Sequence, residues 1–247
     1  MQKVTKRGGD VAATQRTDVG KVRRQNEDAA WFDEERGMFA VADGMGGHLA
    51  GEVASAMAID AMKRLAGSGT AAGISALRSA VAGAHEAIAA HAAKTVGCSG
   101  MGTTLSVMWR GGRYMYIAHV GDSRIYRLRG GELEQITQDH SLVEELVRAR
   151  LITREEARTH PRRNIITRAL GTAGENVPDM LAADTRLGDV WLLCSDGLTG
   201  MVSDKAIADT INSCSNLDAA ADSLLAQALD AGGKDNVTLI LYRDEED

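Results

Sequence analysis

The sequence has few aromatic residues and lacks the long apolar runs of membrane proteins. Three Trp, four Tyr and two Phe stand among 247 residues, so we expect a core built on Ala, Val, Leu, Ile and Met. No apolar stretch approaches the ~20 residues of a membrane-spanning helix. Segment 1–10 is polar and lacks the apolar part of a signal peptide. We therefore expect a cytoplasmic globular protein with no membrane contact, of a length that suits one large domain or two small ones.

An excess of basic residues is also missing. Lys and Arg number 28 against 34 Asp and Glu, which gives a net charge of −6. This balance argues against a nucleic-acid binder, which would usually carry a basic patch or stripe. Cys98, Cys194 and Cys214 are odd in number and form no CxxC pair. They are typical of reduced thiols in a cytosolic protein.

Several catalytic motifs are absent as well. A dinucleotide fingerprint fails because Leu49 stands where its last glycine should be, and a Walker loop fails because Asp235 follows Lys234. The sequence has no HExxH, no GxSxG, and no cysteine followed by arginine six positions later. The chain thus lacks obvious machinery for covalent catalysis, and a metal-activated water remains as the expected nucleophile.

What the sequence does contain is a repeated pattern of aspartates. Each of four aspartates follows or lies beside a short apolar run and precedes a small or turn-forming residue: Asp43, Asp122, Asp196 and Asp235. Carboxylates from distant parts of a chain would repel each other at one site unless a cation lay between them. Hard oxygen ligands suit Mg²⁺ or Mn²⁺. The pattern predicts a divalent-metal hydrolase.

The order of the expected elements indicates an α+β fold. Apolar periodicity predicts helices over 51–66, 74–93, 203–212 and 217–231, and strands over 38–42, 103–110, 114–120, 124–129, 132–136, 190–194 and 237–242. The consecutive strands 103–136 imply antiparallel pairing, because parallel strands need a crossover between them. Segment 139–171, rich in Arg and Glu, is expected to form short helices (141–150 and 153–159) in a mobile insert over one face of the sheet.

Eight short segments together resemble the metal-dependent Ser/Thr protein phosphatases of the PPM (type 2C) family, in its compact bacterial branch. They occur in the family's order over about residues 14 to 243 and lie at 18–28, 42–48, 99–104, 121–124, 139–142, 164–171, 195–198 and 235–238. Each segment alone is weak evidence, whereas eight in register are specific. The resemblance implies a four-layer α-β-β-α sandwich of two antiparallel sheets flanked by helices, with a helical flap at about 139–171. We expect residues 1–247 to form a single catalytic domain.

The resemblance also assigns metal ligands for two Mn²⁺ or Mg²⁺ ions and a possible third. Asp43 would bridge both ions, and the backbone carbonyl of Gly44 would join one of them, which would explain a glycine there by close approach of the backbone to the ion. Asp196 and Asp235 would hold the other ion. Asp122, together with Asp196, would bind the third, weaker ion. Glu27 and Asp28 would act through water or as outer partners of the ligands.

The function implied is hydrolysis of phosphoserine and phosphothreonine in proteins, reversing bacterial Ser/Thr kinase signalling. Arg23 would grip two phosphate oxygens, with Arg24 as its nearest rival. His48 would protonate the leaving oxygen, although a surface histidine in a loop is an equal alternative. We expect a monomer whose partners are phosphorylated proteins, including a Ser/Thr kinase and its substrates.

Three alternatives stay open from the sequence. A pseudophosphatase would keep the fold and bind phosphoproteins without turnover, and a metal phosphohydrolase would act on small molecules. The arginines of the insert could steer acidic phosphoprotein segments toward the cleft, or the insert could be a solvated helical hairpin. The arginines in question are Arg148, Arg150, Arg154, Arg158, Arg162 and Arg163.

Overall fold

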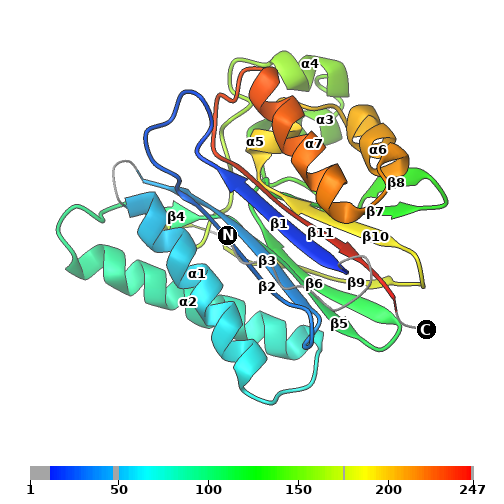
Figure 1. Ribbon diagram of the computed structural model, residues 1–247. Coiled ribbons are helices and arrows are strands. Elements are labelled where there is room, and N and C mark those ends of the chain that lie inside the picture. The colour runs from blue at the N-terminus through cyan, green and yellow to red at the C-terminus, as the bar shows by residue number, and fades with distance from the viewer. Residues whose placement is uncertain (1–11, 47–49, 175, 246–247) are drawn as a thin grey trace.

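Two antiparallel sheets form the centre of the molecule (Figure 1). The computed structural model describes residues 12–46, 50–174 and 176–245. The first sheet has the order β1 (Ala13–Asp18), β11 (Val237–Arg243), β10 (Val190–Cys194), β7 (Arg124–Arg129) and β8 (Glu132–Gln135). The second has the order β2 (Asp28–Asp33), β3 (Met38–Met45), β5 (Leu105–Gly111), β6 (Tyr114–Val120) and β9 (Asp179–Asp184), with β4 (Gly102–Thr103) paired to β3.

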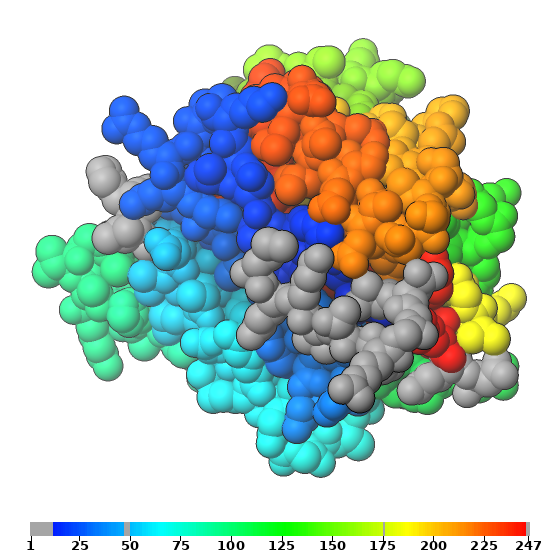
Figure 2. All heavy atoms as spheres, viewed as in Figure 1, coloured from blue at the N-terminus to red at the C-terminus, as the bar shows by residue number. Residues whose placement is uncertain are grey.

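Helices cover the outer face of each sheet. The pair α1 (Ala50–Gly67) and α2 (Ile74–Lys94) packs on the second sheet, and the pair α6 (Asp204–Ser213) and α7 (Leu217–Asp230) packs on the first (Figure 1). Figure 2 shows the two helical layers as separate surfaces, cyan for α1 and orange for α6 and α7, with blue N-terminal residues between them. The predicted α-β-β-α sandwich of antiparallel sheets is confirmed.

The core between the two sheets rests on side chains from both inner faces. Phe39 and Ile117 from the second sheet and Trp191 and Ile240 from the first belong to one cluster, and each is fully buried. Two further clusters lie between each sheet and its helices. Burying apolar surface contributes about 25 cal/mol per Å², so these three layers of contact hold the strand ends in fixed positions.

The flap (139–171) carries two short helices, α3 (Leu142–Arg148) and α4 (Arg154–Thr159). The Ser141 side chain caps α3, and Thr153 and Glu156 form a capping box on α4, so each helix has a defined start. At the base of the flap, Ser141 pairs with Ile166 in an antiparallel bridge. The insert is thus fastened where it leaves the sheet and where it returns.

Most of the expected elements are observed within a few residues of their predicted bounds. The predicted strand 103–110 instead divides into β4 and β5, because the backbone at Thr104 turns to bond Asp43. Strands β1, β2 and β9 and the short helix α5 (Asp196–Thr199) were not among the predicted elements. Within the described ranges, no helix combines the length and apolar character that crossing a bilayer requires.

Candidate active site

Asp28 and Asp43 lie directly opposite each other on neighbouring strands of the second sheet. The register of β2 and β3 places Asp28 opposite Asp43 in the last pair of their ladder. Ser195, at the end of β10 in the first sheet, donates its hydroxyl to Asp28 Oδ2 at 2.8 Å. The two sheets therefore meet at this pair of carboxylates, and the hydrogen bond from Ser195 helps to join them there.

Hydrogen bonds from two threonines fix the backbone of Asp43. The Asp43 N–H donates to Thr104 Oγ1 at 2.9 Å, and the Asp43 carbonyl accepts from Thr104 N and from Thr103 Oγ1, both at 2.9 Å. Thr103 and Thr104 are buried. The position of the carboxylate is thus set by a rigid backbone, as a catalytic ligand requires.

Gly44 is closely surrounded by backbone. A Cβ at this position would collide with the carbonyl oxygen of Gly51 and would lie 2.6 Å from that of Glu27. Its N–H donates to Glu27 O at 3.1 Å. The start of α1 and the Glu27 segment therefore already require a glycine here, whether or not its carbonyl contacts an ion.

Asp196 and Asp235 come from the first sheet, at the start of α5 and just before β11. The segments that follow these two aspartates are in close contact, because a Cβ on Gly197 would collide with the carbonyl oxygen of Asn236. The buried Asn236 side chain ties the N-terminal loop to this edge. Its Oδ1 accepts from Glu27 N at 2.8 Å, and its Nδ2 donates to the carbonyls of Val19 and Gln25 at 3.0 and 2.9 Å.

Asp122 lies in the turn from β6 to β7, next to Gly121. Gly121 has φ +107°, and a Cβ there would meet Thr104, so only glycine fits. The N–H of Gly121 donates to His140 Nδ1 at 3.1 Å, while His140 N–H donates to the Gly121 carbonyl at 2.7 Å. His140 also accepts from Thr167 N at 2.8 Å, across the base of the flap. The Asp122 turn and the flap thus share one anchor.

The electrostatics indicate that these carboxylates converge. Burial raises the pKa of Asp43 well above its usual range, and Asp28, Asp196, Asp122 and Asp235 raise it further. Burial, with the charges of Asp196 and Asp235, raises the pKa of Asp28 to about 7. Burial and the charge of Asp235 likewise raise the pKa of Asp196 to about 6. Residues far apart in the sequence thus repel each other at one place.

Burial also dominates at the two flanking carboxyls. It raises the pKa of Asp122 well above its usual range, and the charges of Asp196 and Asp139 add to this effect. It raises the pKa of Glu27 as well, where the Arg23 guanidinium partly opposes the shift. The Glu27 carboxyl lies against the start of α1, where a Cβ on Gly51 would be 2.8 Å from Glu27 Oε1.

The donor set fits a hard divalent cation. Asp28 Oδ1 is buried and has no hydrogen-bond partner, and its carboxyl faces others from both sheets. Among residues 12–46, 50–174 and 176–245, no three His, Cys, Asp or Glu side chains already form a ligand cage for one ion. One reason is visible at Asp235: its Oδ2 accepts from Arg23 Nη2 at 2.8 Å and its Oδ1 from Asn236 N at 2.9 Å.

The arginines and the histidine of the predicted site have different surroundings. Arg23 is half-exposed and reaches the carboxylate cluster through Asp235. Arg24 is exposed and makes no ion pair with any residue that the structure describes. His48 lies outside the described residues. Sequence reasoning gave no individual role to Ser195, Thr104, Asn236 or His140, whose bonds to the site span long sequence separations; their only signal was membership of the matched segments.

A cleft lined by acidic side chains at the ends of two packed sheets defines the chain as a candidate metal-dependent hydrolase. Comparison with known proteins gives the family. The protein phosphatase 2C profile matches residues 14–237. The serine/threonine phosphatase stp of Listeria welshimeri is 42% identical over 234 residues, covering 92% of this chain and 93% of that protein.

Solved structures of similar chains indicate the same family. The crystal structure of the Mycobacterium tuberculosis serine/threonine phosphatase PstP/Ppp has a TM-score of 0.88 and 41% identity, covering 95% of this chain and 98% of that one. The catalytic domain of PstP in complex with two manganese ions has a TM-score of 0.87 and 39% identity, with the same coverage. The chain belongs to the protein phosphatase 2C family.

Proposed function

We propose that this protein hydrolyses phosphoserine and phosphothreonine monoesters in proteins, with Mn²⁺ or Mg²⁺ as cofactor. The observation that carries this proposal is the meeting of Asp28 and Asp43 from one sheet with Asp196 and Asp235 from the other. Family membership supports it, since relatives with about 40% identity are named serine/threonine phosphatases.

The residues that would hold two ions are Asp43, which would serve both, the backbone carbonyl of Gly44 at one of them, and Asp196 and Asp235 at the other. Asp122 serves a third ion together with Asp196, and Glu27 and Asp28 act as outer partners of the ligands. When bound, the ions supply Lewis acidity toward phosphoryl oxygens and toward water. The PstP structure with two manganese ions supports the number of principal sites.

The chain's own contribution is to bind and orient the phosphate. Arg23, already beside the cluster through Asp235, would offer its guanidinium fork to two phosphate oxygens. His48 remains our candidate to protonate the departing seryl or threonyl oxygen. The partners proposed are phosphorylated proteins, including a Ser/Thr kinase and its substrates, met by a monomeric single catalytic domain. Free cysteines at 98, 194 and 214 support a cytoplasmic setting.

The first test is Asp43→Asn with phosphate release as the readout. Removing one anionic ligand should lower turnover of a phosphothreonine peptide by more than about 100-fold, because even outer partners of metal ligands cost 10–100-fold. Asp60→Asn, on the exposed face of α1, is the matched control and should retain normal turnover. Circular dichroism checks that both variants fold.

The same assay separates the alternatives. Chelator should abolish turnover and added Mn²⁺ should restore it; activity that survives chelator would exclude the metal mechanism. Metal-dependent binding of the phosphopeptide without turnover would favour a pseudophosphatase. Rapid hydrolysis of small phosphate esters with none of phosphopeptides would favour a small-molecule phosphohydrolase.

A further inference from the structure

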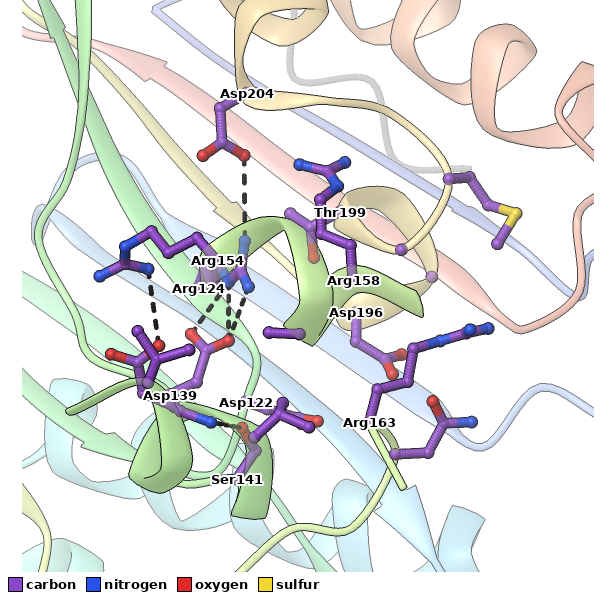
Figure 3. Close-up of a pocket in the computed structure, with 18 of the residues that line it drawn as sticks. Asp122, Arg124, Asp139, Ser141, Arg154, Arg158, Arg163, Asp196, Thr199 and Asp204 are labelled. Carbon is purple, nitrogen blue, oxygen red and sulfur yellow. Dashed lines mark hydrogen bonds and ion pairs between the residues drawn. The ribbon is translucent and has the colours of Figure 1, made fainter. Parts of the chain in front are cut away.

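A cavity of about 530 Å³ lies between the flap and the carboxylate cluster (Figure 3). Its lining includes α3 and α4 residues on one side and Asp122, Asp196 and Asp235 on the other. A volume of this size is typical of sites that bind a ligand. Because the same space touches three of the proposed metal ligands, anything bound at the cluster has the cavity as its neighbour.

The flap side of this cavity carries positive charge that the protein itself does not neutralise. Five basic residues line the cavity. Arg124 is held by both carboxylate oxygens of Asp139, and Arg154 pairs with Glu144 at 3.5 Å. Lys234 comes from the loop before β11, on the side of the carboxylate cluster, and the other two belong to the flap. Arg158 and Arg163 form no ion pair with any residue in the described ranges. Both are exposed and line the cavity, and Figure 3 shows them near Asp196 and Thr199, which line it from α5.

The acidic side chains of the lining do not cancel these two charges. Asp139 is occupied by Arg124, and Asp204 accepts from Tyr126 at 3.2 Å. Glu144 accepts from Gln138 and pairs with Arg154. Asp122, Asp196 and Asp235 belong to the carboxylate cluster. Only Glu155 remains as an acidic group of the flap wall without a partner of its own among the described residues.

We propose that Arg158 and Arg163 form a subsite for a second anionic group of the substrate, near the phosphoresidue that is hydrolysed. This inference rests on the proposed function and names the substrate class: phosphoprotein segments with an Asp, a Glu or a second phosphoresidue close to the scissile one. Guanidinium groups bind carboxylates and phosphates with paired hydrogen bonds. The proposal narrows the six flap arginines named in the sequence analysis to the two that line the cavity without an ion pair among the described residues.

The test compares phosphothreonine peptides that differ only in one flanking residue. A series places a single Asp, its neutral counterpart Asn, or a second phosphothreonine at each of the nearest positions on either side. At the favoured position we expect the wild-type kcat/KM to be about tenfold higher for the Asp peptide than for the Asn peptide. One partly solvated ion pair contributes at most about fivefold, and two arginines are available to the same carboxylate. The second phosphothreonine should give a larger ratio, because it carries more charge.

The matched variants are Arg158→Gln with Arg163→Gln, and as control Arg148→Gln with Arg162→Gln. The control removes the same charge from the flap at positions that do not line the cavity. We expect the Asp-to-Asn ratio to fall toward one in the first double variant and to stay unchanged in the control. Because the readout is a ratio within each variant, a general change in turnover cancels.

Three results would overturn the subsite: a ratio near one in the wild type, a ratio that survives the Arg158 and Arg163 changes, or an equal loss in the control. A preference for the second phosphothreonine without one for Asp would restrict the subsite to phosphate. Failure to hydrolyse every phosphopeptide would overturn the proposed function instead. In that case the same ratio, measured as Kd for fluorescently labelled peptides with Mn²⁺ present, still decides the subsite.

Discussion

At the scale of single residues, Asn236 shows what a sequence pattern cannot supply. The matched segment at 235–238 marks this residue, but its bonds reach Val19, Gln25 and Glu27, more than 200 positions away. Ser195 likewise bonds Asp28, which lies 167 positions away in the sequence. The acidic residues could be predicted because their chemistry is visible in the residue type, whereas the polar residues that orient them have partners that only the fold reveals.

Gly44 and His85 show two further limits of prediction from the sequence. Gly44 was predicted to be a glycine because of its approach to an ion, but the structure gives a steric reason in Gly51 and Glu27. His85, on α2, has no counterpart among the predicted site residues, yet its Nδ1 accepts from the N–H of Gly171 at 3.0 Å, where the flap returns. A lone histidine on a helix gives no sign of a distant backbone donor.

His119 allows a test of stability against pH. The ring is fully buried, bonded to Ser106 Oγ at 2.9 Å and to the Gln138 carbonyl at 3.0 Å. Burial, reinforced by the nearby His140, lowers its pKa from the ordinary 6.5 to about 4. The unfolded chain therefore binds this proton at higher pH than the native state does. Stability should be lost as pH falls from 6.5 toward 4, by about 3 kcal/mol in full.

The measurement is urea denaturation in chelator at several pH values, for wild type and His119→Gln. Asp28 and Asp196 have raised pKa values, so their carboxyls increase stability as pH falls, which opposes the effect of His119. The informative quantity is therefore the difference in unfolding free energy between wild type and variant. Wild type should lose more stability than the variant between pH 7 and pH 4.5. Parallel pH dependences in the two proteins would contradict the role of His119.

At the scale of elements, long periodic segments were predictable and short or marginal ones were not. Helices α1, α2, α6 and α7 carry apolar residues at helical spacing and were expected within one or two residues of their bounds. Strand β9 has the sequence DMLAAD, is only partly buried, and pairs with β6 alone at the edge of its sheet. Helix α5 has four residues, too few for a periodic pattern.

The contact between α5 and β11 gives a prediction about two glycines. Gly197→Ala should destabilise the protein by roughly 1–3 kcal/mol, because the added methyl must push the Asn236 backbone away. Gly83→Ala, on an exposed face of α2 with no atom within 4 Å of the new Cβ, should stabilise it by up to about 1 kcal/mol. Denaturation midpoints measure both, and equal midpoints for the two variants would refute the steric argument.

At the scale of the whole molecule, the site exists only because two sheets are packed together. The first supplies Asp196 and Asp235, the second supplies Asp28 and Asp43, and the turn between β6 and β7, which carries Asp122, leads from one to the other. The layered fold was predictable from the family resemblance. The distance between the sheets, and so the meeting of their carboxylates, depends on core packing that no local pattern encodes.

This arrangement predicts how metal ions affect thermal stability. Without a cation the clustered carboxylates repel one another, so Mn²⁺ should raise Tm by about 5–10 °C at 100 times its Kd, as binding worth about 2.7 kcal/mol implies. Asp196→Asn should raise Tm in chelator by a few degrees and should reduce the increase that Mn²⁺ gives.

Asp60→Asn is again the control, since it removes a charge from the surface of α1 and should leave the Mn²⁺ effect unchanged. Differential scanning calorimetry with and without chelator supplies the values. A wild type whose Tm ignores Mn²⁺, or an Asp196 variant with the full increase, would show that the carboxylates do not share an ion.

The bonds of His140 have a mechanical consequence. His140 bonds the turn beside Asp122 through both its ring and its backbone N–H, and its carbonyl accepts from Thr167 N where the flap returns to the sheet. With Asp122 as the proposed ligand of a third ion, movement of the flap toward a bound phosphoprotein would shift this ligand, and binding of the ion would in turn restrain the flap. Binding of the phosphoprotein and binding of the third cation would then be coupled through His140.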